Sequence, residues 1–247
     1  MPVRWGRLLV ENHRGALVPR VLGIALAIDA VVWTVVVATF ADVGAAGWGA
    51  LGGLLLVFCA GLIDDLVPAG PRGLRDHLRS AALGHPTTGL VKILVIVGSA
   101  VVVIALQPPR PTSVEVLGIV LLAACANLWN GLDVVPGRSL KAFLLPGLAF
   151  AIWGVPSDAP AVVGLLVGAV VVLPFDLRET AMLGDSGANL LGFAAGIGLY
   201  DALPDPCVAV AAGVAVVLNV VAEIVSFSRV IERTPPLRWV DALGRRA

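Results

Sequence analysis

The chain has 247 residues, of which 58% are hydrophobic and 14% are charged, and its mean hydropathy is +0.95. Soluble domains carry about 25% charged residues, so this composition excludes an ordinary soluble protein and indicates a membrane protein. The net charge is zero and no basic stripe is visible, so no nucleic-acid partner is expected. Three cysteines without a CxxC pair argue against a zinc site or a disulfide framework.

The predicted elements are helices that cross the membrane, which need about 20 apolar residues each. The predicted fold is an all-α polytopic membrane helix bundle of about eight transmembrane helices, forming a single integral membrane domain over residues 1–247. Residues 227–247 mix arginines with apolar side chains and are predicted to be a C-terminal cytoplasmic interfacial tail. The eight predicted spans are 18–41, 44–63, 88–106, 114–129, 140–155, 160–175, 187–203 and 206–226.

The distribution of basic residues predicts how these spans are oriented. If the N-terminus is cytoplasmic and the spans alternate, Arg110 is the only Lys or Arg on the outer side. Cytoplasmic loops carry an excess of Lys and Arg, so both termini are predicted to be cytoplasmic. The outer loops are only a few residues long, which places any chemistry on the inner face.

The first polar cluster is the sequence GLIDDL, residues 61–66, at the inner end of the second predicted span. Two adjacent carboxylates, Asp64 and Asp65, repel each other and are costly near hydrocarbon. A bound cation would relieve both costs. The alternative is that the two residues simply end the helix among the lipid headgroups.

The second polar cluster follows the fourth predicted span, in NLWNGLDVVPGRSLK, residues 127–141. Asn127, Asn130 and Asp133 are three residues apart and would share one helix face. Together with Arg138 and Lys141 they suit a phosphorylated ligand. A helix-ending turn with solvated charges is the other interpretation.

The third polar cluster is MLGDSGANLLGF, residues 182–193, which begins the seventh predicted span. Asp185 could cap this helix, and helix N-termini also attract phosphate. Asp176 lies just upstream in the same loop. Lys92, near the start of the third span, could contact phosphate or extend toward the interface.

Together these clusters resemble the polyprenyl-phosphate N-acetylhexosamine-1-phosphate transferases, bacterial membrane enzymes that begin cell-envelope glycans. GLIDDL looks like the family's Asp-Asp motif, and NLWNGLD resembles its Asn-x-x-Asn-x-x-Asp motif. MLGDSGANLLG is similar to its Gly-Asp-x-Gly-Ser block. ENHRGALVPRVLG, residues 11–23, resembles its opening. The resemblance covers roughly residues 10–200.

The resemblance implies transfer of a sugar-1-phosphate from a UDP-sugar to a polyprenyl phosphate lipid, with UMP released. It implies Mg²⁺ as cofactor, with Mn²⁺ as an alternative. It also implies a site on the cytoplasmic face of the bacterial inner membrane, in a family whose members often form homodimers. The implied catalytic residues are Asp64, Asp65, Asp133 and Asp185, with Asp185, Asp64 and Asp65 as metal ligands. The implied substrate-binding residues are Asn127, Asn130, Lys92, Arg138, Lys141 and Asp176.

The sequence also departs from the family pattern. Family members usually have ten or more spans, Pro136 stands where the family has a carboxylate, and the histidine-rich cytoplasmic loop has no counterpart. These departures leave an alternative, an inactive membrane protein that binds prenyl phosphate or acts as a scaffold. A small transporter is a third hypothesis, but only Asp29 lies deep within a predicted span.

Overall fold

The computed structural model describes residues 8–12, 14–67, 88–147 and 159–245, and the described chain is almost entirely helical. A short antiparallel hairpin comes first, with β1 (Leu9–Glu11) paired to β2 (Leu17–Pro19). The long helices are α1 (Leu22–Ala38), α2 (Gly44–Leu66), α4 (Thr88–Leu106), α5 (Thr112–Leu132), α8 (Pro160–Leu177), α9 (Gly184–Ala202) and α10 (Asp205–Ile224). Three short helices complete the described fold: α6 (Arg138–Leu144), α11 (Phe227–Arg233) and α12 (Pro235–Ala242).

The prediction of an all-α membrane protein with several spans is confirmed. Within the described residues, five helices are long and apolar enough to cross a membrane: α2, α4, α5, α8 and α10. Helix α1 is a shorter apolar helix of 17 residues. Large apolar side chains such as Val36, Leu56 and Val102 are exposed along these helices, where a soluble protein would carry polar residues.

Seven of the eight predicted spans coincide with long helices, and the fifth does not. Predicted span 140–155 begins as α6, which has seven residues, and then runs into residues 148–158, which lie outside the described residues. The count of eight spans and the orientation of the termini therefore stay predictions.

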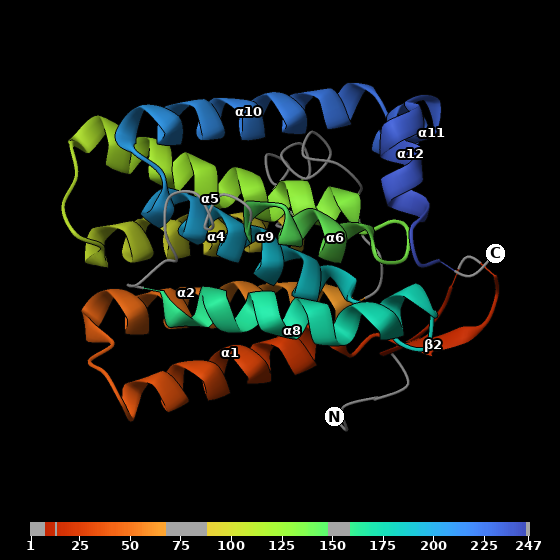
Figure 1. The fold of residues 1–247 in the computed structure, drawn as a ribbon, viewed down its shortest axis with the longest axis horizontal. Helices are drawn as coiled ribbons and strands as arrows, with labels where there is room; N and C mark the ends of the chain where they lie inside the picture. The colour runs from red at the N-terminus through yellow and green to blue at the C-terminus, as the bar shows by residue number, and fades with distance from the viewer. Residues whose placement is uncertain (1–7, 13, 68–87, 148–158, 246–247) are drawn as a thin grey trace.

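Helix α9 is the centre of the bundle, with α1, α2, α5 and α8 packed around it (Figure 1). Fifteen of its nineteen residues are buried, whereas α10 buries only Val208, Ala212 and Ala215. Small residues allow this central position. A Cβ atom on Gly196 would lie 2.6 Å from Cα of Leu122, so only glycine lets the α9 and α5 backbones approach this closely.

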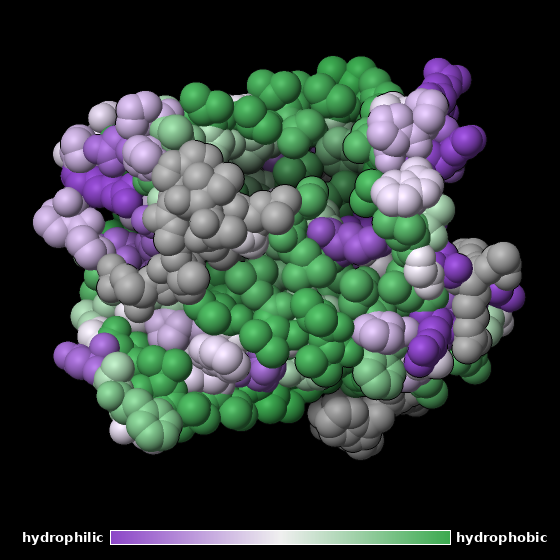
Figure 2. Space-filling view, in the orientation of Figure 1, coloured by the Kyte–Doolittle hydropathy of each residue, from purple (hydrophilic) through white to green (hydrophobic). Residues whose placement is uncertain are grey.

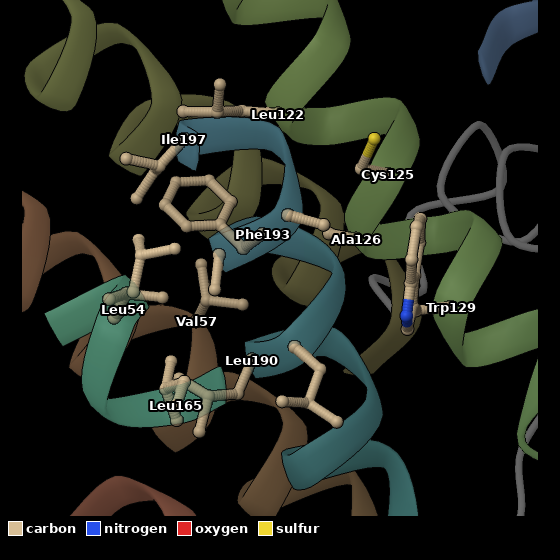
Figure 3. Packing of buried hydrophobic residues seen from close by; sticks show 14 of the residues in the cluster. Leu54, Val57, Leu122, Cys125, Ala126, Trp129, Leu165, Leu190, Phe193 and Ile197 are labelled. Atoms are coloured by element: carbon tan, nitrogen blue, oxygen red, sulfur yellow. The ribbon is translucent and has the colours of Figure 1, made fainter. Parts of the chain in front are cut away.

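Phe193 of α9 is fully buried at the middle of the core (Figure 3). It lies among Leu54 and Val57 of α2, Leu122 of α5 and Leu165 of α8. Apolar surface covers the middle of the molecule, and hydrophilic residues gather toward its two ends (Figure 2). One of these ends carries the hairpin, α11 and α12 (Figure 1).

Candidate functional site

A lysine joins two of the predicted aspartates at the end of the bundle. The Lys92 ammonium lies 2.7 Å from Oδ2 of Asp64 and 2.8 Å from Oδ2 of Asp185, and it donates a hydrogen bond to each. These residues come from the last turn of α2, the first turns of α4 and the first turn of α9. The Lys92 side chain is only 13% exposed, so the three charges form a partly buried cluster.

Asp65, the neighbour of Asp64, faces a different set of groups. Its Oδ1 accepts hydrogen bonds from Nη1 of Arg20 at 2.8 Å and from the backbone N–H of Asp185 at 3.0 Å. Its Oδ2 accepts one from the backbone N–H of Ser186, also at 3.0 Å. Asp65 therefore binds the N-terminal turn of α9, whereas Asp64 binds Lys92.

The fourth predicted catalytic aspartate, Asp133, ends α5 beside this cluster. Burial raises the pKa of Asp133 well above its ordinary value, and the nearby carboxylates of Asp176, Asp185 and Asp65 raise it further, against the lowering effect of Arg20. Asp176 is buried and accepts a hydrogen bond from the backbone N–H of Gly137 at 2.6 Å. Asp176 thus holds the turn that follows Asp133.

The two asparagines of the second cluster lie along a cavity. Asn127 donates to Oδ1 of Asn219 in α10 at 2.6 Å, and Asn219 donates in turn to the carbonyl oxygens of Ala124 and Ala215. The side-chain oxygen of Asn130 is buried and has no hydrogen-bond partner within the described part of the chain. Asn130 is therefore available to a ligand, whereas Asn127 holds α10 against α5.

The cavity has a volume of about 910 Å³ and is lined by α4, α5, α10 and the start of α11. Its polar groups include Lys92, Asn130 and Glu223, and much of its remaining wall is apolar. The full lining is Gly89, Lys92, Ile93, Ile96, Val97, Ala123, Asn127, Leu128, Asn130, Gly131, Val134, Asn219, Val220, Ala222, Glu223, Ser226, Phe227 and Ser228.

The structure pairs the remaining two predicted binding residues with the C-terminal segment. Arg138 is buried and makes a bidentate ion pair with Asp241, through Nε at 2.9 Å and Nη2 at 3.0 Å. Lys141 donates to the carbonyl oxygens of Val240, Asp241 and Leu243 at the end of α12. Both basic groups thus attach the tail to the bundle, a use that the sequence did not predict.

Two residues at the site were not singled out by the sequence. Arg20 directly follows the Pro19 of the opening motif, and its partner Asp65 is 45 positions away. Asn219 is the only amide in the apolar α10. A lone amide inside an apolar span needs a partner, so the sequence did hold a signal for Asn219. Arg20 lies within the opening motif, ENHRGALVPRVLG, but that motif did not predict its partner.

No group of three or more His, Cys, Asp or Glu side chains that could hold a metal ion occurs within residues 8–12, 14–67, 88–147 and 159–245. The candidate cation donors in these ranges are the pair Asp64 and Asp185. Comparisons of the chain with protein-family models, with curated proteins and with solved structures find no match.

Proposed function

We propose that this protein is a membrane phosphotransferase that moves a sugar-1-phosphate, of the N-acetylhexosamine class, from a UDP-sugar to a polyprenyl phosphate. The observation that carries the proposal is the contact of Lys92 with both Asp64 and Asp185. Two of the three polar motifs meet Lys92 in this one cluster, and a scaffold would have no need to gather carboxylates at the edge of the hydrocarbon.

The donors of the cluster fit Mg²⁺, with Mn²⁺ as a close substitute. Two carboxylates already share one cationic group, and Mg²⁺ commonly uses one or two carboxylates and takes its other ligands from phosphates and water. Asp64 and Asp185 would hold the ion, which when bound would neutralise phosphate charge. Asp65 is a poorer ligand than the sequence suggested, because both of its oxygens accept hydrogen bonds from protein groups.

The chain's own residues account for alignment of the two substrates. The cavity that Lys92 lines would offer its apolar residues to an isoprenoid chain and Lys92 to the lipid phosphate. Asn130, with its unpaired side-chain oxygen, would orient the UDP-sugar together with Asp133. The site would open to the cytoplasm, as the distribution of basic residues predicts.

The reaction exchanges one pyrophosphate bond for another. An oxygen of the lipid monophosphate attacks the phosphorus that bears the sugar. The bond from this phosphorus to the bridging oxygen breaks, and UMP leaves with that oxygen. A general base is unnecessary because the lipid phosphate is already ionised near neutral pH. Lys92 would offset the charge that gathers as the phosphates approach each other.

The test is transfer of radiolabelled sugar-phosphate from UDP-GlcNAc to undecaprenyl phosphate by the purified protein in lipid nanodiscs, with Mg²⁺ or EDTA. We expect labelled lipid that requires Mg²⁺, and a loss of about 100-fold or more in Asp185→Asn. Asp201→Asn is the matched control, an aspartate at the opposite end of the same helix, and should retain activity. Product formed equally with EDTA or by Asp185→Asn would overturn the proposal.

One observation favours a second candidate, an inactive protein that binds prenyl phosphate. Arg138 and Lys141, which would neutralise phosphate charge in an enzyme, are both engaged by the tail. This candidate predicts that the purified protein binds polyprenyl phosphate but forms no product with any UDP-sugar in a panel of N-acetylhexosamines.

A further inference from the structure

The adjacent aspartates Asp64 and Asp65 differ in burial and in the groups that they contact. The side chain of Asp65 is 1% exposed, compared with 24% for Asp64. Three donors surround the Asp65 carboxylate, namely Nη1 of Arg20 and the backbone N–H groups of Asp185 and Ser186. A carboxylate that accepts three hydrogen bonds has little remaining capacity to bind a cation.

The two backbone donors belong to the first turn of α9. The first four N–H groups of a helix have no partner within the helix, and a nearby side chain usually accepts from them. No local residue caps α9, whose preceding residue is Leu183. Asp65 supplies this cap from α2, 120 positions away in the sequence. The position of Asp185 therefore depends on Asp65.

Arg20 connects this cap to the N-terminal hairpin. The residues on either side of it are also joined to the segment before α9, because the N–H of Met182 donates to the carbonyl of Pro19 and the N–H of Leu22 donates to the carbonyl of Met182. Close packing completes the arrangement. A Cβ atom on Gly61 would lie 2.7 Å from Cα of Ser186, so the first turn of α9 lies directly against α2.

We propose that Arg20 and Asp65 are positioning residues that fix the first turn of α9, so that Asp185 faces Lys92 and Asp64. Asp65 takes no part in holding a cation. We call the contacts of Arg20 and Asp65 with the first turn of α9 the clamp. The importance of the clamp to catalysis rests on the proposed function, but the clamp itself can be tested without any activity.

The test is amide hydrogen exchange, followed by mass spectrometry, of the peptide that spans the start of α9, with the full chain in nanodiscs. Asp65→Asn replaces one accepting oxygen by an amide donor and should raise exchange in this peptide by about tenfold. Arg20→Ala should raise it less, because the carboxylate remains. Asp64→Asn is the matched control, the neighbouring residue with the same change, and should leave exchange in this peptide unaltered.

A second measurement uses the wild-type chain, so it holds even where a variant fails to fold. Adding Mg²⁺ should leave exchange at the start of α9 unchanged or slower. If Mg²⁺ raised this exchange as much as Asp65→Asn does, the cation would be taking Asp65 from the helix, and the clamp would be refuted. Equal effects of Asp64→Asn and Asp65→Asn would refute it as well.

The transfer assay separates this inference from the proposed function. If the exchange pattern is as expected but no labelled lipid forms, the clamp is supported and the proposed transferase activity is refuted. If the protein transfers sugar-phosphate but Asp65→Asn leaves exchange at the start of α9 unchanged, only the clamp is refuted.

Discussion

The Lys92 ammonium occupies the space between the carboxylates of Asp64 and Asp185, where a divalent cation would also bind. Two positive charges cannot share this space without strong repulsion. Lys92 thus compensates both carboxylates, and under the proposed function it would have to turn away for a cation to bind. The same lysine would then be free to pair with a phosphate.

This competition predicts an unusual effect of removing Lys92. Lys92→Gln should bind Mn²⁺ at least about tenfold more tightly than wild type in the absence of substrate, because the competing charge is gone. Its transfer activity should fall all the same. Binding is measured from the free Mn²⁺ signal in electron paramagnetic resonance.

Lys141→Gln is the control for this experiment, since the chain has only these two lysines and Lys141 contacts the tail. The control should bind Mn²⁺ as wild type does. Weaker Mn²⁺ binding by Lys92→Gln would show that the lysine supports the cation site and does not compete with it.

Residue spacing predicted that the polar motifs gather at one end of the bundle but not which partner each side chain contacts. The sequence grouped Asp64 with Asp65 as metal ligands, because the sequence alone does not distinguish the surroundings of two adjacent carboxylates. Their separation became visible only with the partners of Asp65, which lie 45 and 120 positions away. The roles of Asn130, Asp133 and Asp185 toward substrates stay predictions.

At the scale of elements, the short helices α11 and α12 form a tail, and ion pairs and hydrogen bonds around Asp241 attach this tail to the bundle. Asp241 accepts from Arg138 and also pairs with Arg245. Although burial alone would raise it, hydrogen bonds from Arg138 and Arg245 lower the pKa of Asp241 to about 2. The sequence predicted an interfacial tail here, but the contact with Arg138 required the fold, because 103 positions separate the two residues.

The tail should therefore detach at acidic pH. An aspartate whose pKa is lowered by folding, from about 3.9 to about 2, contributes stability that is complete above the unfolded value. This contribution is lost as the pH falls from about 4 toward 2. A spin label on Glu232→Cys should become more mobile in this range. If the label's mobility stayed constant down to pH 2, the ion pair would not hold the tail.

Substitution of the same aspartate tests this attachment at neutral pH. Asp241→Asn removes the carboxylate and leaves the buried Arg138 without its charge partner, which is costly. We expect trypsin to cleave after Arg233 and Arg238 several-fold faster in this variant. Asp205→Asn, which alters an ion pair with Arg110 that is more exposed, should leave the cleavage rate unchanged.

At the scale of the whole molecule, the all-α class and the positions of most long helices were predictable because the hydrocarbon imposes length and composition on any span. Predicted span 88–106 and α4 have the same bounds, and six others agree with a long helix within a few residues. Span 140–155 was less predictable, because Arg138, Lys141 and Pro146 interrupt the apolar sequence there.

The orientation of the whole bundle has a direct test. In a variant without its native cysteines, Ser113→Cys marks the end near Arg110, and Glu232→Cys marks the end near the candidate site. Both positions are exposed. A membrane-impermeant maleimide should label Ser113→Cys in intact bacterial cells and Glu232→Cys only after lysis. The reverse pattern would place the site outside, where UDP-sugars are absent.

The central position of α9 has a consequence for how the chain enters the membrane during synthesis. Because protein surrounds α9 on nearly every side and its surface is rich in glycine and alanine, it would gain little by facing lipid alone. It also leaves the ribosome after α1, α2, α5 and α8, the helices that pack around it. The earlier helices must therefore wait in the bilayer with their α9-facing surfaces uncovered. Completion of the bundle, and with it assembly of the Asp64, Lys92 and Asp185 cluster, becomes a late event in biogenesis.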